Sequence, residues 1–75
     1  MSFNAKAEIL NTKLLQRIRK EREKTGLSQW DFAIKIGLGQ SAYHKIEKGK
    51  TRLDMFRFFK IAEALEVPAS ELMNN

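Results

Sequence analysis

The segment from Leu27 to Lys50, LSQWDFAIKIGLGQSAYHKIEKGK, constrains the fold of this chain more than any other. It holds two short helix-forming stretches separated by Gly37 and Gly39. Ser28 is placed to cap the first stretch, because an acidic residue follows three positions later as in a capping box. Gly37 suits a helix end, and Gly39 can cap the next helix. The pattern predicts two helices joined by a tight turn, at about residues 28–36 and 40–48.

Helix formers also dominate on both sides of this segment, and no stretch alternates as a strand would. A helix is predicted from about residue 12 to 25, and another from Asp54 to the break at Val67-Pro68, followed by a short last turn. The fold class is therefore all-α, a compact five-helix domain at residues 12–75. The expected core residues are Leu14, Leu15, Ile18, Phe32, Ala33, Ile36, Tyr43, Ile46, Met55, Phe58, Phe59, Ala62, Leu65 and Leu72.

The positive charge is concentrated in one part of the chain. The net charge is +5 at pH 7, and residues 35–60 alone carry seven Lys/Arg against two Asp/Glu. Residues 61–75 carry three acidic residues and no basic one. Such a surface can simply be solvated. Because it coincides with a helix that would fit the major groove, it favours a footprint for nucleic-acid phosphate.

Composition argues against several other function classes. The chain has no cysteine, and its one histidine is His44, which argues against a disulfide, a zinc site or another cofactor. No nucleophile–base pair and no phosphate-cradling glycine loop is present, so an enzyme is not expected. The sequence shows neither an apolar run near 18 residues nor a signal-peptide core, which predicts a cytoplasmic protein without membrane contact.

From Ile18 to Leu72 the chain resembles the Cro/repressor-type helix-turn-helix family, the lambda repressor-like or XRE family. The matching segments are IRKEREKTGLSQ, the Ala33 and Gly37 pair, LGQS, KIEKGK, and FRFFKIAEALEV followed by SEL. A match that extends through the flanking helices is much more specific than a lone helix-turn-helix. The resemblance departs from the family at Tyr43, where Val or Ile is usual; its ring is expected to be buried with its hydroxyl hydrogen-bonded.

The resemblance implies roles for residues on and around the second helix of the pair. Gln29 would touch a phosphate and brace Gln40, which opens the recognition helix. The residues implied in base reading are Gln40, Ser41, His44 and Lys45. The residues predicted to contact phosphate are Gln29, Trp30, Lys48, Lys50, Thr51 and Arg52. Arg22 and Glu47 match a structural ion pair between two helices, and their inward-pointing pattern agrees, because a buried charge needs a partner.

Each of these assignments has a simpler alternative. A glutamine such as Gln40 can bond adenine N6 and N7 together, but it can also cap a helix or be solvated. Any one of the basic residues can be merely solvated. For His44, contact with a base or phosphate is weighed against plain exposure, while catalysis or metal binding has no supporting partner residue.

Trp30 and Ile34 lie four residues apart and predict an apolar patch on one helix face. One possibility lays Trp30 against the DNA backbone. The other covers the patch with Phe3, Ile9 and Leu10 from residues 1–11, an N-terminal extension or arm. Coverage is favoured because an uncovered patch invites aggregation.

These features predict a sequence-specific DNA-binding transcriptional regulator, a repressor or autoregulator. It would read a palindromic operator in double-stranded DNA as a homodimer, with Leu53 and Phe56 as the candidate dimer contacts. Two alternatives stay open. One is a DNA-binding antitoxin with a protein toxin as partner, which a toxin-like neighbouring reading frame would favour and the absence of a toxin-wrapping tail disfavours. The other is a protein-interaction domain on the same scaffold, for which binding would be insensitive to salt.

Overall fold

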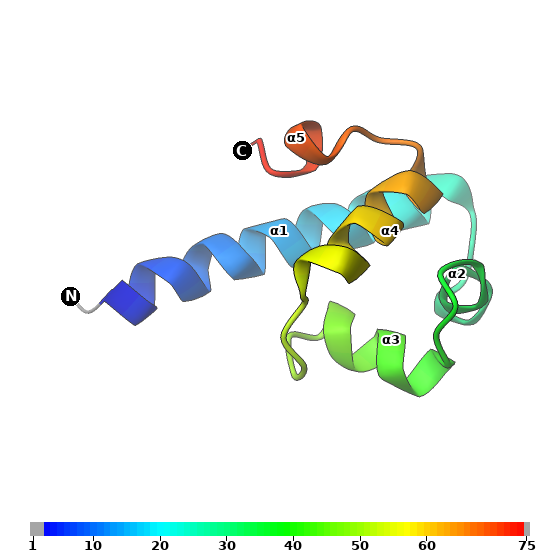
Figure 1. Cartoon of the computed structure of the whole chain (residues 1–75), viewed down its shortest axis with the longest axis horizontal. Helices are drawn as coiled ribbons and strands as arrows, with labels where there is room; N and C mark the ends of the chain where they lie inside the picture. Colours follow the sequence, from blue (N-terminus) through cyan, green and yellow to red (C-terminus); the bar gives the residue numbers. More distant parts are fainter. Residues whose placement is uncertain (1–2, 75) are drawn as a thin grey trace.

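The computed structural model describes residues 3–74 of the chain, and in this range it contains five helices and no strand (Figure 1). The all-α prediction is therefore confirmed. The helices are α1 (Phe3–Thr25), α2 (Gln29–Lys35), α3 (Gln40–Glu47), α4 (Met55–Leu65) and α5 (Ala69–Leu72).

The α2–α3 pair begins and turns where the local signals indicated. The Ser28 hydroxyl accepts a hydrogen bond from the Asp31 backbone N–H at 3.1 Å, which caps α2. After α2, Gly37 has a φ of 77°, a conformation that other residues rarely adopt. In this turn the Leu38 N–H donates to the Ala33 carbonyl oxygen at 2.8 Å, which completes the end of the helix. The turn chemistry thus fixes how α3 leaves α2.

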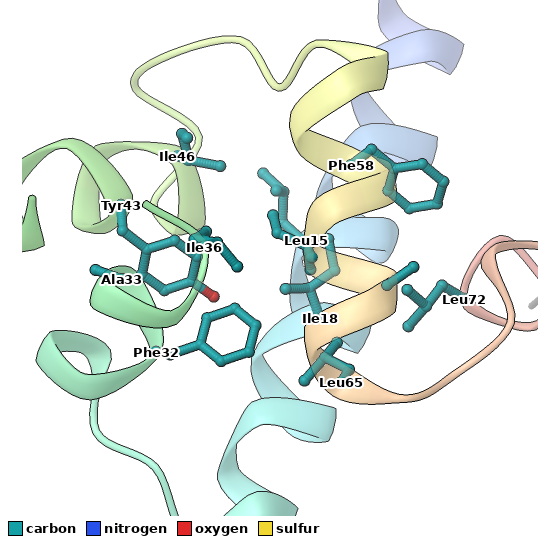
Figure 2. Packing of buried hydrophobic residues seen from close by; sticks show 12 residues of the cluster. Leu15, Ile18, Phe32, Ala33, Ile36, Tyr43, Ile46, Phe58, Leu65 and Leu72 are labelled. Atoms are coloured by element: carbon teal, nitrogen blue, oxygen red, sulfur yellow. The ribbon is translucent and has the colours of Figure 1, made fainter. Parts of the chain in front are cut away.

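One hydrophobic core is assembled from all five helices (Figure 2). The Phe32 and Tyr43 rings, with centroids 5.2 Å apart, join α2 to α3 within it. The buried apolar residues are Leu15, Ile18, Phe32, Ala33, Ile36, Tyr43, Ile46, Phe58, Ile61, Ala62, Leu65 and Leu72.

The predicted core face of α4 was partly wrong. Met55 and Phe59 are 54% and 52% exposed, while Ile61, which was not predicted, is fully buried. The reason is the direction in which α4 packs. Its buried stripe runs through Phe58, Ile61 and Leu65 at helical spacing, which leaves Met55 and Phe59 beyond its edge.

Of the two possibilities for the N-terminal segment, the structure shows a helical extension: α1 begins at Phe3, and its extra turns project beyond the other helices (Figure 1). Residues 3–25 are continuous, so the segment before residue 12 cannot fold back onto α2, which lies near the opposite end of α1 (Figure 1). Ile9, Leu10, Trp30 and Ile34 all stay about half exposed or more. Coverage of Trp30 and Ile34 within one chain was therefore wrong; the Phe3 side chain lies outside the described part of the structure. Among residues 3–74, no helix is long and apolar enough to span a membrane.

Candidate nucleic-acid interface

A buried ion pair fastens α3 to α1. Arg22 Nε and Nη2 each lie 3.0 Å from an oxygen of the Glu47 carboxylate, and Arg22 Nη1 donates to the Leu27 carbonyl oxygen at 2.9 Å. The two side chains are only 9% and 3% exposed. Burial alone would raise the pKa of Glu47, but hydrogen bonds led by those of Arg22 hold it below its ordinary value. The hydrogen bond to Glu47 likewise raises the pKa of Arg22. Both groups are thus charged at neutral pH.

Gln29, at the first turn of α2, bonds two residues of α3. Its Nε2 donates to Glu47 Oε1 at 3.1 Å, and its Oε1 lies 3.0 Å from Nδ1 of His44. Both ends of the amide are therefore engaged, and the expected brace from Gln29 to Gln40 is not formed. The reason is geometric: Gln29 faces the last turns of α3, whereas Gln40 stands at its first residue. The half-buried His44 is the partner that the sequence did not indicate.

The outer face of α3 carries the predicted base-reading residues. Tyr43 and Ile46 are buried on the inner face, while Gln40, Ser41 and Lys45 are exposed. No described residue makes a hydrogen bond to the side chain of Gln40 or Ser41. The structure therefore leaves the polar atoms at the front of α3 open to a ligand.

Tyr43 meets half of its expectation. Its ring is fully buried. Its hydroxyl lies near the Glu47 carboxylate but has no hydrogen bond of standard geometry to any residue in the described range. Burial, and then the neighbouring Glu47, raises the pKa of Tyr43 well above its ordinary value, so it stays neutral. The Tyr43 hydroxyl thus approaches Glu47 without completing the predicted hydrogen bond.

The candidate phosphate-binding residues surround the far end of α3. The backbone N–H groups of Lys50 and Thr51 both donate to the Lys45 carbonyl oxygen, at 2.8 and 3.2 Å, so the loop wraps the helix end. Lys48, Lys50 and Thr51 are exposed, and so is Trp30 on α2.

Arg52 is the exception in this loop, because an acidic residue of α1 is bonded to it. Its Nη2 lies 2.7 Å from Glu8 Oε1, and both side chains are exposed. Glu8 is 44 positions away in the sequence, so no local pattern could have indicated this contact.

The predicted dimer contacts lie at the end of the loop and the start of α4. Leu53 is half-buried against the core, and Phe56 is 71% exposed with Lys60 Nζ 5.2 Å from its ring centroid. Together with Met55 and Phe59, Phe56 makes an exposed apolar face at the start of α4.

Residues 18–72 match the model of the helix-turn-helix family HTH_3. The chain belongs to this family. Its α2 and α3 lie within the matched residues and are the paired helices of the motif. The chain is a helix-turn-helix transcription regulator, and the Cro/repressor resemblance is confirmed.

The family includes relatives from several bacteria. The control protein C.MunI of Mycoplasma sp is 39% identical over 61 residues, covering 81% of this chain and 80% of that protein. The transcriptional repressor RstR of the cryptic phage CTXphi in Vibrio cholerae is 33% identical over 60 residues, which are 80% of this chain but 54% of the repressor. Among solved structures, the restriction-modification controller protein C.AhdI from Aeromonas hydrophila has a TM-score of 0.76 and 34% identity, covering 83% of this chain and 90% of that one.

Proposed function

We propose that this helix-turn-helix regulator is a small homodimeric controller that binds a palindromic operator through α3 and represses or autoregulates transcription. The observation that carries the proposal is the outer face of α3, polar, basic and unpaired, on a helix that a buried ion pair fastens to α1. A rigid helix of this kind can present side chains to base edges in the major groove. The loop after α3 carries basic side chains that would contact backbone phosphates.

Similarity to two control proteins supports a controller role. The control protein C.MunI is 39% identical to this chain, and the restriction-modification controller protein C.AhdI is 34% identical with a TM-score of 0.76. We infer that the operator controls genes of the restriction-modification kind. Selecting bound fragments from random DNA tests the proposal: an inverted repeat is expected, and recovery of no common sequence would contradict it.

Gln40→Ala is expected to weaken binding to the best operator by about 1–3 kcal/mol and to relax the choice of one base, most favourably an adenine. Gln40 is free of partners in the described structure, so its amide is available to bond adenine N6 and N7. The measurement is the Kd of the variant on the preferred operator and on all single-base changes of it. A loss of the same size on every sequence would mean that Gln40 positions the helix and does not read a base.

Phe56→Glu is expected to leave the fold intact and to weaken binding to a full palindrome more than to a half-site. Exposed apolar patches on small soluble proteins mark contact surfaces, and a two-fold dimer would bury the Phe56 face of both copies. Such a dimer sets its two α3 helices about 34 Å apart, one turn of DNA. Sedimentation of the wild type and of Phe56→Glu measures the oligomeric state, and the Kd of each protein is measured on half-site and full-palindrome DNA.

The matched control is Met73→Glu, which places the same charge at an apolar residue 52% exposed, outside both the Phe56 face and the Trp30–Ile34 patch. It should leave self-association unchanged. If Phe56→Glu lowers binding to half-sites as much as to full sites, the face around Phe56 is not the dimer contact.

A further inference from the structure

Four side chains from three helices form one continuous chain of hydrogen bonds at the front of the interface. It runs from Arg22 on α1 to Glu47 on α3, from Glu47 to Gln29 on α2, and from Gln29 back to His44 on α3. The Arg22–Glu47 pair is buried, and His44 at the other end is half-buried. This hydrogen-bond network therefore leads from the interior to the surface that faces DNA in helix-turn-helix motifs.

The buried Arg22–Glu47 pair determines which group donates in each hydrogen bond of this network. An ionised carboxylate only accepts hydrogen bonds, and the guanidinium only donates. The amide that faces Glu47 must therefore present its NH₂ group, at 3.1 Å from the carboxylate oxygen. The opposite orientation would set the amide oxygen against the carboxylate, with two lone pairs facing each other.

This orientation leaves the Gln29 oxygen facing Nδ1 of His44, at 3.0 Å. An oxygen acceptor requires a donor opposite it, so Nδ1 carries the proton. In a neutral imidazole the other nitrogen is then an acceptor. No residue in the described range is hydrogen-bonded to Nε2 of His44.

We infer that the buried Arg22–Glu47–Gln29 chain fixes His44 in the Nδ1–H tautomer, so that Nε2 offers an acceptor that selects the exocyclic amino group of adenine or cytosine. The tautomer rests on the contacts alone, and its use in reading DNA rests on the proposed function. In the major groove, adenine N6 and cytosine N4 are the donors, whereas guanine and thymine offer acceptors there. A neutral Nε2 also faces phosphate oxygens unfavourably, which distinguishes His44 from the lysines around it.

The tautomer can be read directly by ¹⁵N NMR of the full chain without DNA. His44 is the sole histidine, so its two ring nitrogens are assigned without ambiguity. The spectra are recorded on the neutral ring, the form that has one protonated and one unprotonated nitrogen. Nδ1 is expected to give the signal of a protonated nitrogen and Nε2 that of an unprotonated one. The reverse pattern, or an average of the two, would overturn the inference.

Two variants test whether Gln29 sets the tautomer of His44. The hydrogen-bond network from Arg22 through Glu47 and Gln29 to His44 is called the relay below. Gln29→Met removes the amide while keeping the length of the side chain, and it should let the two tautomers mix. Gln40→Ala alters a neighbouring residue outside the relay and should leave the ¹⁵N pattern of the wild type. A mixed pattern in Gln40→Ala, or an unchanged one in Gln29→Met, would show that something other than Gln29 sets the tautomer.

Binding to DNA tests the second part of the inference, that Nε2 of His44 accepts a hydrogen bond from a base. At one base position the wild type should prefer adenine or cytosine by about two- to tenfold, the range of a single hydrogen bond, and His44→Ala should abolish that preference. A preference for guanine or thymine lost in His44→Ala would overturn the readout. A protein with the expected tautomer that binds no DNA would overturn the readout and the proposed function together, and leave the relay standing.

Discussion

Arg22→Ala is expected to lower the free energy of unfolding by about 3–5 kcal/mol, because it leaves a buried carboxylate without its cation. Glu47 is 3% exposed and would be left beside neutral groups, the Gln29 amide and the Tyr43 hydroxyl, in place of a cation. Total stabilities of small domains are about 5–15 kcal/mol, so this one substitution removes a large share. Urea unfolding followed by circular dichroism at neutral pH measures it.

The matched control is Arg19→Ala on the same helix. It breaks the ion pair of Arg19 with Glu23, 3.4 Å long, in which both side chains are more than half exposed. Exposed pairs of this spacing contribute no more than about 0.5 kcal/mol. Equal losses in Arg22→Ala and Arg19→Ala would contradict the structural role of the buried pair.

Lowering the pH should remove the stability that the Arg22–Glu47 ion pair contributes. The pKa of Glu47 is lowered in the folded state from its ordinary 4.5. Its contribution to stability is therefore complete above about pH 4.5 and is lost as the pH falls through the lowered folded value. In Arg22→Ala, burial acts on Glu47 without its cation and raises its pKa, so this part of the acid dependence should shrink or reverse its sign.

Salt should weaken DNA binding steeply. If each subunit meets about three phosphates, a dimer meets about six, and the logarithm of the binding constant should fall with the logarithm of salt at a slope near −5. A fourfold rise in salt then costs about a thousandfold in affinity. Lys50→Ala should weaken all sequences alike and make the slope shallower by about one unit per subunit. A flat dependence on salt would contradict DNA as the ligand.

The features that could be predicted from sequence are those that depend on neighbours along the chain. Ser28 and Gly37 mark the limits of α2 because caps and left-handed turns are made by residues next to them. The family pattern added the pairing of Arg22 with Glu47. By contrast, helical periodicity locates a buried stripe but not its edges, so Ile61 was missed and Phe59 was misplaced.

Other features depend on contacts between distant segments. Nothing before residue 12 breaks a helix, yet nothing local shows that α1 continues back to Phe3. The partner of Gln29 is decided by the distance between two helix faces, and a sequence pattern does not contain that distance. The contact of Arg52 with Glu8 joins segments 44 residues apart for the same reason.

Because Gln29 is bonded to His44, side chains on the outer surface of α3 differ in how much conformational entropy they would lose on binding. Gln29 and His44 are already held in one arrangement in the free protein. Within residues 3–74, no side-chain hydrogen bond restrains Gln40 or Lys45, and ordering each would cost about 0.5–1.5 kcal/mol on binding. The held side chains can therefore reject a wrong base with little adjustment, while the free ones can adapt their rotamers to several sequences. Under the proposed function, one helix would present both a rigid and a tolerant reader to the same groove.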